Sequence, residues 1–126
     1  MKSCVVTKNF ACDPSKVWLY LSKPALNHWC AEVERYEESS DGMQATEYHK
    51  GGTEVKLTFT RKEKNRCMSG SFAGGKVRGT FTVLLLGGGD STSVECTVEI
   101  EGLGLFAKAN KPVDARLEQL RKAVGV

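Results

Sequence analysis

The sequence predicts an α+β fold in which a curved antiparallel sheet of about six to seven strands wraps around one long C-terminal helix. Between residues 33 and 101, apolar and polar residues alternate with period two, in segments separated mostly by glycine-containing turns. Beyond this region the apolar residues recur with a helical period. A single helix can bury its apolar stripe against a whole sheet if the sheet curves around the helix.

The N-terminal segment predicts one strand followed by two short helices. Residues 4–12 alternate as a strand does. Asp13 is the expected N-cap of a first helix, because its carboxylate can accept hydrogen bonds from the first free backbone N–H groups. Pro14 suits the first helical position, and Pro24 ends the helix. A second short helix is expected over residues 25–30.

Successive segments of the middle region alternate as half-buried strands do. In the clearest of them Val55, Leu57 and Phe59 fall on one face, while charged residues and threonines fall on the other. The predicted strands are residues 33–38, 43–50, 54–60, 68–72, 77–85 and 94–101. Because short turns join them in order, an antiparallel meander is expected.

The last segment predicts the long helix. Val113, Leu117, Leu120 and Val124 repeat at intervals of four, three and four residues, which places them on one helix face. Pro112 is expected to kink this helix or to begin its regular part. A curved sheet cannot close tightly on a helix along its whole length, so we expect an internal cavity with a mainly apolar lining.

The bulk composition predicts one cytoplasmic domain spanning residues 1–126. The chain is 40% hydrophobic and 26% charged, which is ordinary for a globular protein. No apolar run is long enough for a transmembrane helix or a signal peptide. The five cysteines are an odd number without a C-x-x-C pair, so neither a disulfide framework nor a zinc site is expected.

Charge and histidine content argue against nucleic-acid and metal binding. The net charge is only +3, and the basic stretch 61–66 lacks the interleaved aromatic residues of a nucleic-acid site. A solvated hairpin tip explains this stretch better. The chain has two histidines, His28 and His49, which are far apart in sequence. We therefore expect no metal and no cofactor.

Two short stretches carry a family resemblance. Residues 11–18, followed by Leu21 and Pro24, resemble the first strand-to-helix corner of the START-like, birch-pollen-allergen-like (SRPBCC) superfamily. Residues 92–100 and 102–104, before a helix with an internal proline, resemble its C-terminal part. The groups most similar are the polyketide cyclase/dehydrase-like proteins and those similar to the G-subunit of carbon monoxide dehydrogenase. The resemblance implies a helix-grip fold with a hydrophobic ligand cavity.

Two glycine motifs are similar to nucleotide-binding signatures and are better explained as turns. Residues 70–76 match a phosphate-binding P-loop up to its lysine, but Val77 replaces the metal-binding Ser or Thr and no helix follows. Residues 102–107 match a dinucleotide fingerprint, but too little chain follows for a second parallel strand. We expect a hairpin at the first motif and a strand-to-helix corner at the second.

Three residues are candidates for acid–base catalysis. Glu47 and His49 share one face of a regular strand. Inside a pocket such a pair can move protons on a carbonyl substrate, and Arg78 could assist it. The sequence favours the simpler interpretation that Glu47 and His49 face solvent on an edge strand. No nucleophile elbow is present to suggest other catalysis.

Periodicity also predicts the residues that line the cavity. The inward-facing candidates combine aromatic and aliphatic residues of the strands with two residues near the start of the long helix. They are Val55, Leu57, Phe59, Phe72, Phe81, Val83, Cys96, Val98, Phe106 and Asn110. Asn110 is either an orienting group for one ligand oxygen or the cap of a helical segment beginning near Pro112.

These observations favour a carrier or sensor of a small hydrophobic, lipid-like or polyketide-like molecule over an enzyme. One alternative is a polyketide cyclase or dehydratase that uses the acid–base candidates. Another is an assembly or membrane-recruitment module similar to the carbon monoxide dehydrogenase G-subunit, which would expose an apolar patch around Leu103, Leu105 and Phe106. Monomer and homodimer both stay open, because an edge strand can pair with a second copy.

Overall fold

The computed structural model describes residues 2–23, 29–104 and 108–125, and it contains one seven-stranded sheet, a short helix and a long helix. The elements are β1 (Lys2–Phe10), α1 (Pro14–Ser22), β2 (Val33–Glu38), β3 (Gln44–His49), β4 (Glu54–Glu63), β5 (Cys67–Gly74), β6 (Val77–Gly88), β7 (Ser91–Glu101) and α3 (Asn110–Val124). Every pair of neighbouring strands is antiparallel.

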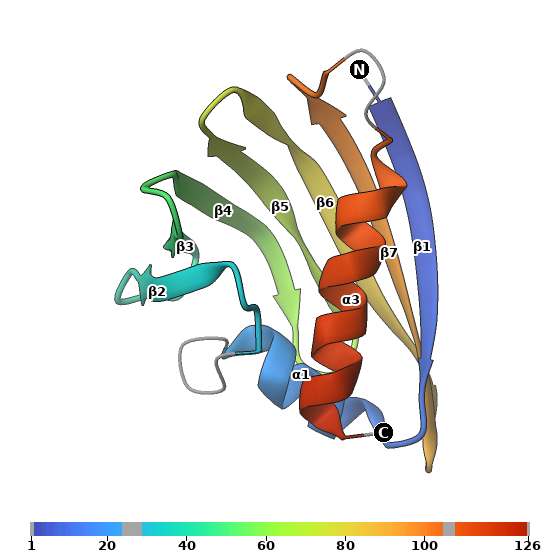
Figure 1. Cartoon of the computed structure of the whole chain (residues 1–126). Helices are drawn as coiled ribbons and strands as arrows, with labels where there is room; N and C mark the ends of the chain where they lie inside the picture. Colours follow the sequence, from blue (N-terminus) through green and yellow to red (C-terminus); the bar gives the residue numbers. More distant parts are fainter. Residues whose placement is uncertain (1, 24–28, 105–107, 126) are drawn as a thin grey trace.

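The strand order is β1-β7-β6-β5-β4-β3-β2, so β1 and β2 are the edges of the sheet. Strands β2 to β7 form the predicted meander, and β1 joins it by pairing with β7. Figure 1 shows the sheet curling around α3, which runs across its concave face beside β1 and β7. The predicted fold class is confirmed.

The first helix begins as its sequence predicts. The Asp13 side chain accepts hydrogen bonds from the backbone N–H groups of Ser15 and Lys16, and Pro14 is the first helical residue. The expected second helix falls largely on residues 24–28, which lie outside the described residues. Its last two residues, Trp29 and Cys30, are not helical.

The first glycine motif forms a hairpin turn, as expected, and the second is described only over residues 102–104. The stretch 70–76 runs through the end of β5 into the turn before β6 and is not followed by a helix. Gly102 follows the last residue of β7 with a φ of 95°, and a side chain there would collide with the backbone carbonyl of Lys76. Glycine is therefore required at this corner. The basic stretch 61–66 forms the end of β4 and the tip of the β4–β5 hairpin.

The long helix starts earlier than Pro112. Because α3 begins at Asn110, Pro112 lies in its first turn, where a proline breaks no intrahelical hydrogen bond. Ala109 occupies the N-cap position and its side chain makes no capping bond. The predicted capping role of Asn110 near Pro112 is therefore wrong. The helix contains no proline deeper in its length, so no kink is needed.

One side of α3 is packed firmly against the sheet. Phe10, Val17, Val94 and Leu120 are at most 1% exposed and form the most tightly buried part of the core. At the surface, Lys8 of β1 forms ion pairs with Asp114 (3.0 Å) and Glu118 (3.2 Å) of α3. These contacts hold the helix toward β1 and leave space between it and the other strands.

Candidate functional site

A cavity of about 400 Å³ lies between α3 and the concave face of the sheet. Most of its wall is apolar and comes from β4 to β7 and from the inner side of α3. The apolar lining residues of these elements are Val55, Leu57, Phe59, Met68, Phe72, Val77, Phe81, Val83, Cys96, Val98, Ile100, Ala109, Pro112, Val113 and Leu117. The expectation of an internal apolar cavity is confirmed for the described part of the chain.

Three aromatic rings form a continuous part of this wall. Phe59 and Phe81 meet edge to face with ring centroids 6.0 Å apart, and Phe72 lies 6.5 Å from Phe81. Phe72 and Phe81 are half-buried although they face inward. Opposite Phe72 on β6 stands Gly79, where a side chain would collide with the backbone carbonyl of Glu99 on β7 and come within 2.9 Å of the Phe72 ring. The glycine therefore leaves room for this aromatic wall.

Cys96 belongs to the apolar wall and is not a reactive group. Burial raises the pKa of its thiol to about 11, and the nearby Cys4 contributes to the rise. The thiol therefore stays protonated at neutral pH, and a protonated thiol is a poor nucleophile. All five cysteines are free thiols.

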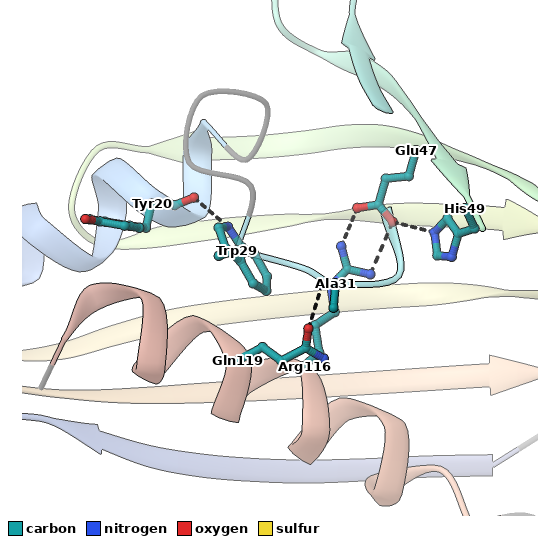
Figure 2. A network of polar contacts seen from close by, with 7 residues as sticks. All are labelled: Tyr20, Trp29, Ala31, Glu47, His49, Arg116 and Gln119. Atoms are coloured by element: carbon teal, nitrogen blue, oxygen red, sulfur yellow. Dashed lines mark hydrogen bonds and ion pairs between the residues drawn. The ribbon is translucent and has the colours of Figure 1, made fainter. Parts of the chain in front are cut away.

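The opposite side of the cavity carries an ion pair whose carboxylate is buried. Glu47 of β3 is only 2% exposed, and its carboxylate accepts hydrogen bonds from both terminal nitrogens of Arg116 on α3. Its Oε1 atom lies 3.2 Å from Arg116 Nη1 and 3.0 Å from His49 Nε2. Figure 2 shows the guanidinium and the imidazole converging on this carboxylate. A two-pronged arginine contact of this kind is both strong and geometrically specific.

The ion pair keeps Glu47 charged. Burial alone would raise the pKa of its carboxyl, but the charge and hydrogen bonds of Arg116, together with the bond to His49, outweigh burial and lower it. A carboxylate accepts hydrogen bonds and does not donate them, so His49 Nε2 carries the proton of their shared bond. The other ring nitrogen, Nδ1, is then the acceptor in neutral histidine.

Neighbouring residues position Arg116. The Trp29 ring lies 5.5 Å from its guanidinium carbon, and the Trp29 indole N–H donates to the Tyr20 carbonyl oxygen at 2.8 Å. One turn further along the helix, Gln119 accepts a hydrogen bond of 2.7 Å from the Ala31 backbone N–H. As Figure 2 shows, these bonds join Trp29 to α1 and Ala31 to α3.

Tyr36 adds a hydroxyl to the same side. It stands directly opposite Glu47 in the β2–β3 pairing, and it lines the cavity. Burial and the negative charges of Glu38 and Glu47 raise the pKa of Tyr36 to about 12, so the hydroxyl keeps its proton. No hydrogen bond joins this hydroxyl to the residues that the structure describes, which leaves it available to a ligand.

The predicted lining residues lie largely where the alternation places them. Eight of the ten line the cavity, namely Val55, Leu57, Phe59, Phe72, Phe81, Val83, Cys96 and Val98. Phe106 lies outside the described residues. Asn110 is exposed and does not line the cavity, so it does not orient a ligand there.

The predictions for the acid–base candidates need two corrections. Glu47 and His49 do not face solvent on an edge strand, because β3 lies between β2 and β4 and both residues line the cavity. Arg78 does not belong to the site, since its side chain is 75% exposed and pairs with Glu101 on the outer face.

Sequence reasoning missed Arg116, Trp29 and Tyr36. A signal for Arg116 was present, because it lies three residues after Val113 and one before Leu117, on the apolar stripe of the helix. A charge on such a stripe is unusual unless it has a buried partner. Trp29 lies outside every periodic segment, so no pattern pointed to it.

The described residues show neither a metal cluster nor a membrane-crossing helix. No group of three or more His, Cys, Asp or Glu side chains suited to a metal ion occurs among them. Across the same residues no helix is long and apolar enough to cross a membrane. Among the residues described, the large apolar side chains that are exposed are Val5, Leu19 and Leu86, which lie on three separate elements. The patch expected around Leu103, Leu105 and Phe106 lies partly outside the described residues, and Leu103 packs against the core.

A curved antiparallel sheet that encloses a long C-terminal helix and an apolar cavity defines a helix-grip, START-like protein. The sequence profile of the family "Polyketide cyclase / dehydrase and lipid transport" matches residues 1–125. The chain therefore belongs to this family, within the superfamily that its corner motifs resemble. No curated protein matches the sequence significantly.

Solved structures with the same fold cover almost the whole chain. The Mll3558 protein from Rhizobium loti aligns with a TM-score of 0.80 at 14% identity, covering 97% of this chain and 96% of its own. A START superfamily protein from Mycobacterium smegmatis aligns with a TM-score of 0.76 at 16% identity, covering 98% of this chain and 94% of its own.

A third solved structure comes from a biosynthetic locus. DynU16, a protein of the dynemicin biosynthetic locus, aligns with a TM-score of 0.75 at 12% identity, covering 97% of this chain and 46% of its own. At such low identities these similarities establish the fold and leave the ligand and reaction open.

Proposed function

We propose that the protein binds a small hydrophobic molecule inside this cavity and acts as its carrier or sensor. The main observation in support of this proposal is the unfilled space of about 400 Å³, which is bounded by half-buried aromatic and aliphatic side chains. Apolar surface that folding leaves uncovered gains free energy when a ligand covers it. The eight sequence-predicted lining residues and the family's association with lipid transport support this proposal.

Native mass spectrometry of the freshly purified protein tests the proposal. A discrete extra mass that disappears on denaturation is expected, and it would give the mass of the ligand. Because purification can strip a weak ligand, the protein is also titrated with ethylnaphthalene, an apolar probe without polar atoms. If no mass is retained and ethylnaphthalene does not bind, the proposal is wrong.

A second candidate function is acid–base catalysis on a carbonyl substrate. It is favoured by Glu47 and His49, which line the cavity within 3.0 Å of one another. In this reaction His49 Nδ1 would remove a proton from the carbon beside the carbonyl, and the electron pair would move to the carbonyl oxygen as an enolate.

Proton exchange tests this second function. In D₂O, acetylnaphthalene should exchange its methyl protons faster with the wild type than with His49→Gln, as followed by NMR. Equal rates for the two proteins, at probe concentrations that occupy both, would remove the catalytic proposal and leave the carrier proposal standing.

The cellular setting and domain organisation are proposals on the same basis. Five free thiols support a reducing cytoplasmic location. One sheet wrapped around one helix supports a single domain over residues 1–126. Peripheral contact with a membrane is retained as a means of delivering a lipid-like ligand.

A further inference from the structure

The polar side of the cavity holds hydrogen-bond donors that the described residues do not use. Arginine has five N–H groups, and Arg116 directs two of them to Glu47, which leaves three. The Tyr36 hydroxyl adds a fourth unused donor among the described residues. The carboxylate of Glu47 already accepts from Arg116 and His49. A ligand oxygen that accepts hydrogen bonds can therefore pair with the unused N–H groups of Arg116 and with the Tyr36 hydroxyl.

The charge of this side argues against an anionic ligand. Arg116 is the only arginine or lysine among the described lining residues, and Glu47 neutralises it at hydrogen-bond distance. Glu32, an exposed residue of the lining, adds a further negative charge near the guanidinium. An anion entering here would lose its hydration and meet no net positive charge.

We infer that the cavity selects neutral apolar molecules carrying a carbonyl oxygen, such as ketones, aldehydes or esters, with Tyr36 and Arg116 donating to that oxygen. This inference rests on the proposed function and specifies its ligand class. The carbonyl oxygen points toward β2, β3 and α3, while the apolar remainder lies against Phe59, Phe72 and Phe81.

Three probes with one ring system test this selectivity. Acetylnaphthalene, ethylnaphthalene and naphthoic acid, substituted at the same ring carbon, present a carbonyl, a methylene and a carboxylate to the same position. Their dissociation constants are measured at neutral pH by fluorescence titration. Acetylnaphthalene should bind about tenfold more tightly than ethylnaphthalene, as one or two hydrogen bonds allow. Naphthoic acid should bind no more tightly than ethylnaphthalene.

Tyr36→Phe is the matched variant, because it removes one hydroxyl and leaves the ring that lines the cavity. It should reduce the preference for acetylnaphthalene about three- to tenfold, with ethylnaphthalene unchanged. Tyr48→Phe is the control, since that hydroxyl lies outside the lining and bonds Glu37. Arg116→Lys keeps the positive charge next to Glu47 but loses the planar set of guanidinium N–H donors. It should therefore also reduce the preference for acetylnaphthalene over ethylnaphthalene.

Each outcome separates this inference from the proposed function. A preference for acetylnaphthalene that falls in Tyr36→Phe and persists in Tyr48→Phe supports the inference. Equal binding of acetylnaphthalene and ethylnaphthalene, or tightest binding of naphthoic acid, overturns the inference while hydrophobic binding stands. Failure of all three probes to bind overturns the inference, and if native mass spectrometry also finds no retained mass, it overturns the proposed function as well.

Discussion

The two halves of the interior use similar residues for different purposes. Around α1, β1 and the end of α3, Phe10, Val17 and Leu120 are completely enclosed. Across the sheet, Leu57, Phe72 and Phe81 also point inward but stay half-buried beside the cavity. Figure 1 shows the reason in the arrangement of the elements, because α3 lies toward β1 and β7 and away from β3 and β4.

This difference separates stability from binding. In the closed half, apolar burial is complete before any ligand arrives, so its free energy belongs to folding. In the open half, the same kind of surface is still accessible and its burial is available to a ligand. Substitutions in the two halves should therefore affect different measurements.

The largest effect is expected in the closed half. Leu120→Ala removes a side chain that is 0% exposed and leaves a void, which should cost about 3 kcal/mol of unfolding free energy in urea titrations. Its affinity for ethylnaphthalene should stay within about twofold of the wild type at temperatures where it is folded. Leu86→Ala, at an exposed position, is the control and should cost under about 0.5 kcal/mol. Equal losses of unfolding free energy in Leu120→Ala and Leu86→Ala would contradict the assignment of the closed half to stability.

The next largest effect is expected at the ion pair. Arg116→Met leaves the Glu47 carboxylate buried without its cation and should lower the unfolding free energy by about 2 kcal/mol. The partial exposure of Arg116 places this value below that of a completely buried pair. The double variant Glu47→Gln/Arg116→Met removes both charges and should recover most of the loss. No recovery in the double variant would show that packing of Arg116, and not charge pairing, accounts for the loss.

A smaller stability effect is expected in the aromatic wall. Phe81→Ala removes a half-buried ring that contacts Phe59 and Phe72, and it should cost about 1–2 kcal/mol of unfolding free energy. Its affinity for ethylnaphthalene should fall about tenfold, because ligand contacts are lost. Thr80→Ala, on the outer face of the same strand, should change neither quantity. Unchanged affinity in Phe81→Ala would contradict the assignment of this wall to binding.

The smallest effect is a pH dependence. The folded pKa of Glu47 lies below the 4.5 of an ordinary glutamate, so the folded state favours its charged form. The resulting stability is present above pH 4.5 and is lost as the pH falls through the folded pKa. The stability difference between the wild type and Glu47→Gln should therefore be largest near neutral pH and shrink in acid. A difference that grows in acid would contradict the sign of this shift.

Most of the fold could be predicted from the sequence, because the spacing of apolar residues along each strand and helix is set by local backbone geometry. Alternation along β4 to β7 identified the inward residues, since a strand sends successive side chains to opposite faces. The Asp13–Pro14 pair located the start of α1 by local hydrogen bonding alone. The curvature that opens the cavity follows from one helix facing a seven-stranded sheet.

The polar side of the cavity depended on long-range contacts and was harder to predict. Glu47 and His49 share one face of β3, and whether that face meets solvent or the cavity depends on how the whole sheet curves around α3. The partner of Glu47 lies 69 positions away on α3, and local periodicity does not pair such distant residues. The capping role predicted for Asn110 was wrong, because a polar residue near the start of a helix is typical of a cap, whereas Asn110 is itself the first residue of α3.

Filling the cavity tests the central claim most directly. Leu57→Trp adds a large ring to a half-buried lining residue of β4, while Thr58→Trp adds the same ring to the exposed outer face of that strand. Ethylnaphthalene affinity, measured for both variants and the wild type, should fall more than about tenfold in Leu57→Trp. It should stay unchanged in Thr58→Trp. Equal affinities in all three proteins would mean that apolar ligands bind elsewhere, and the cavity would lose its assigned role.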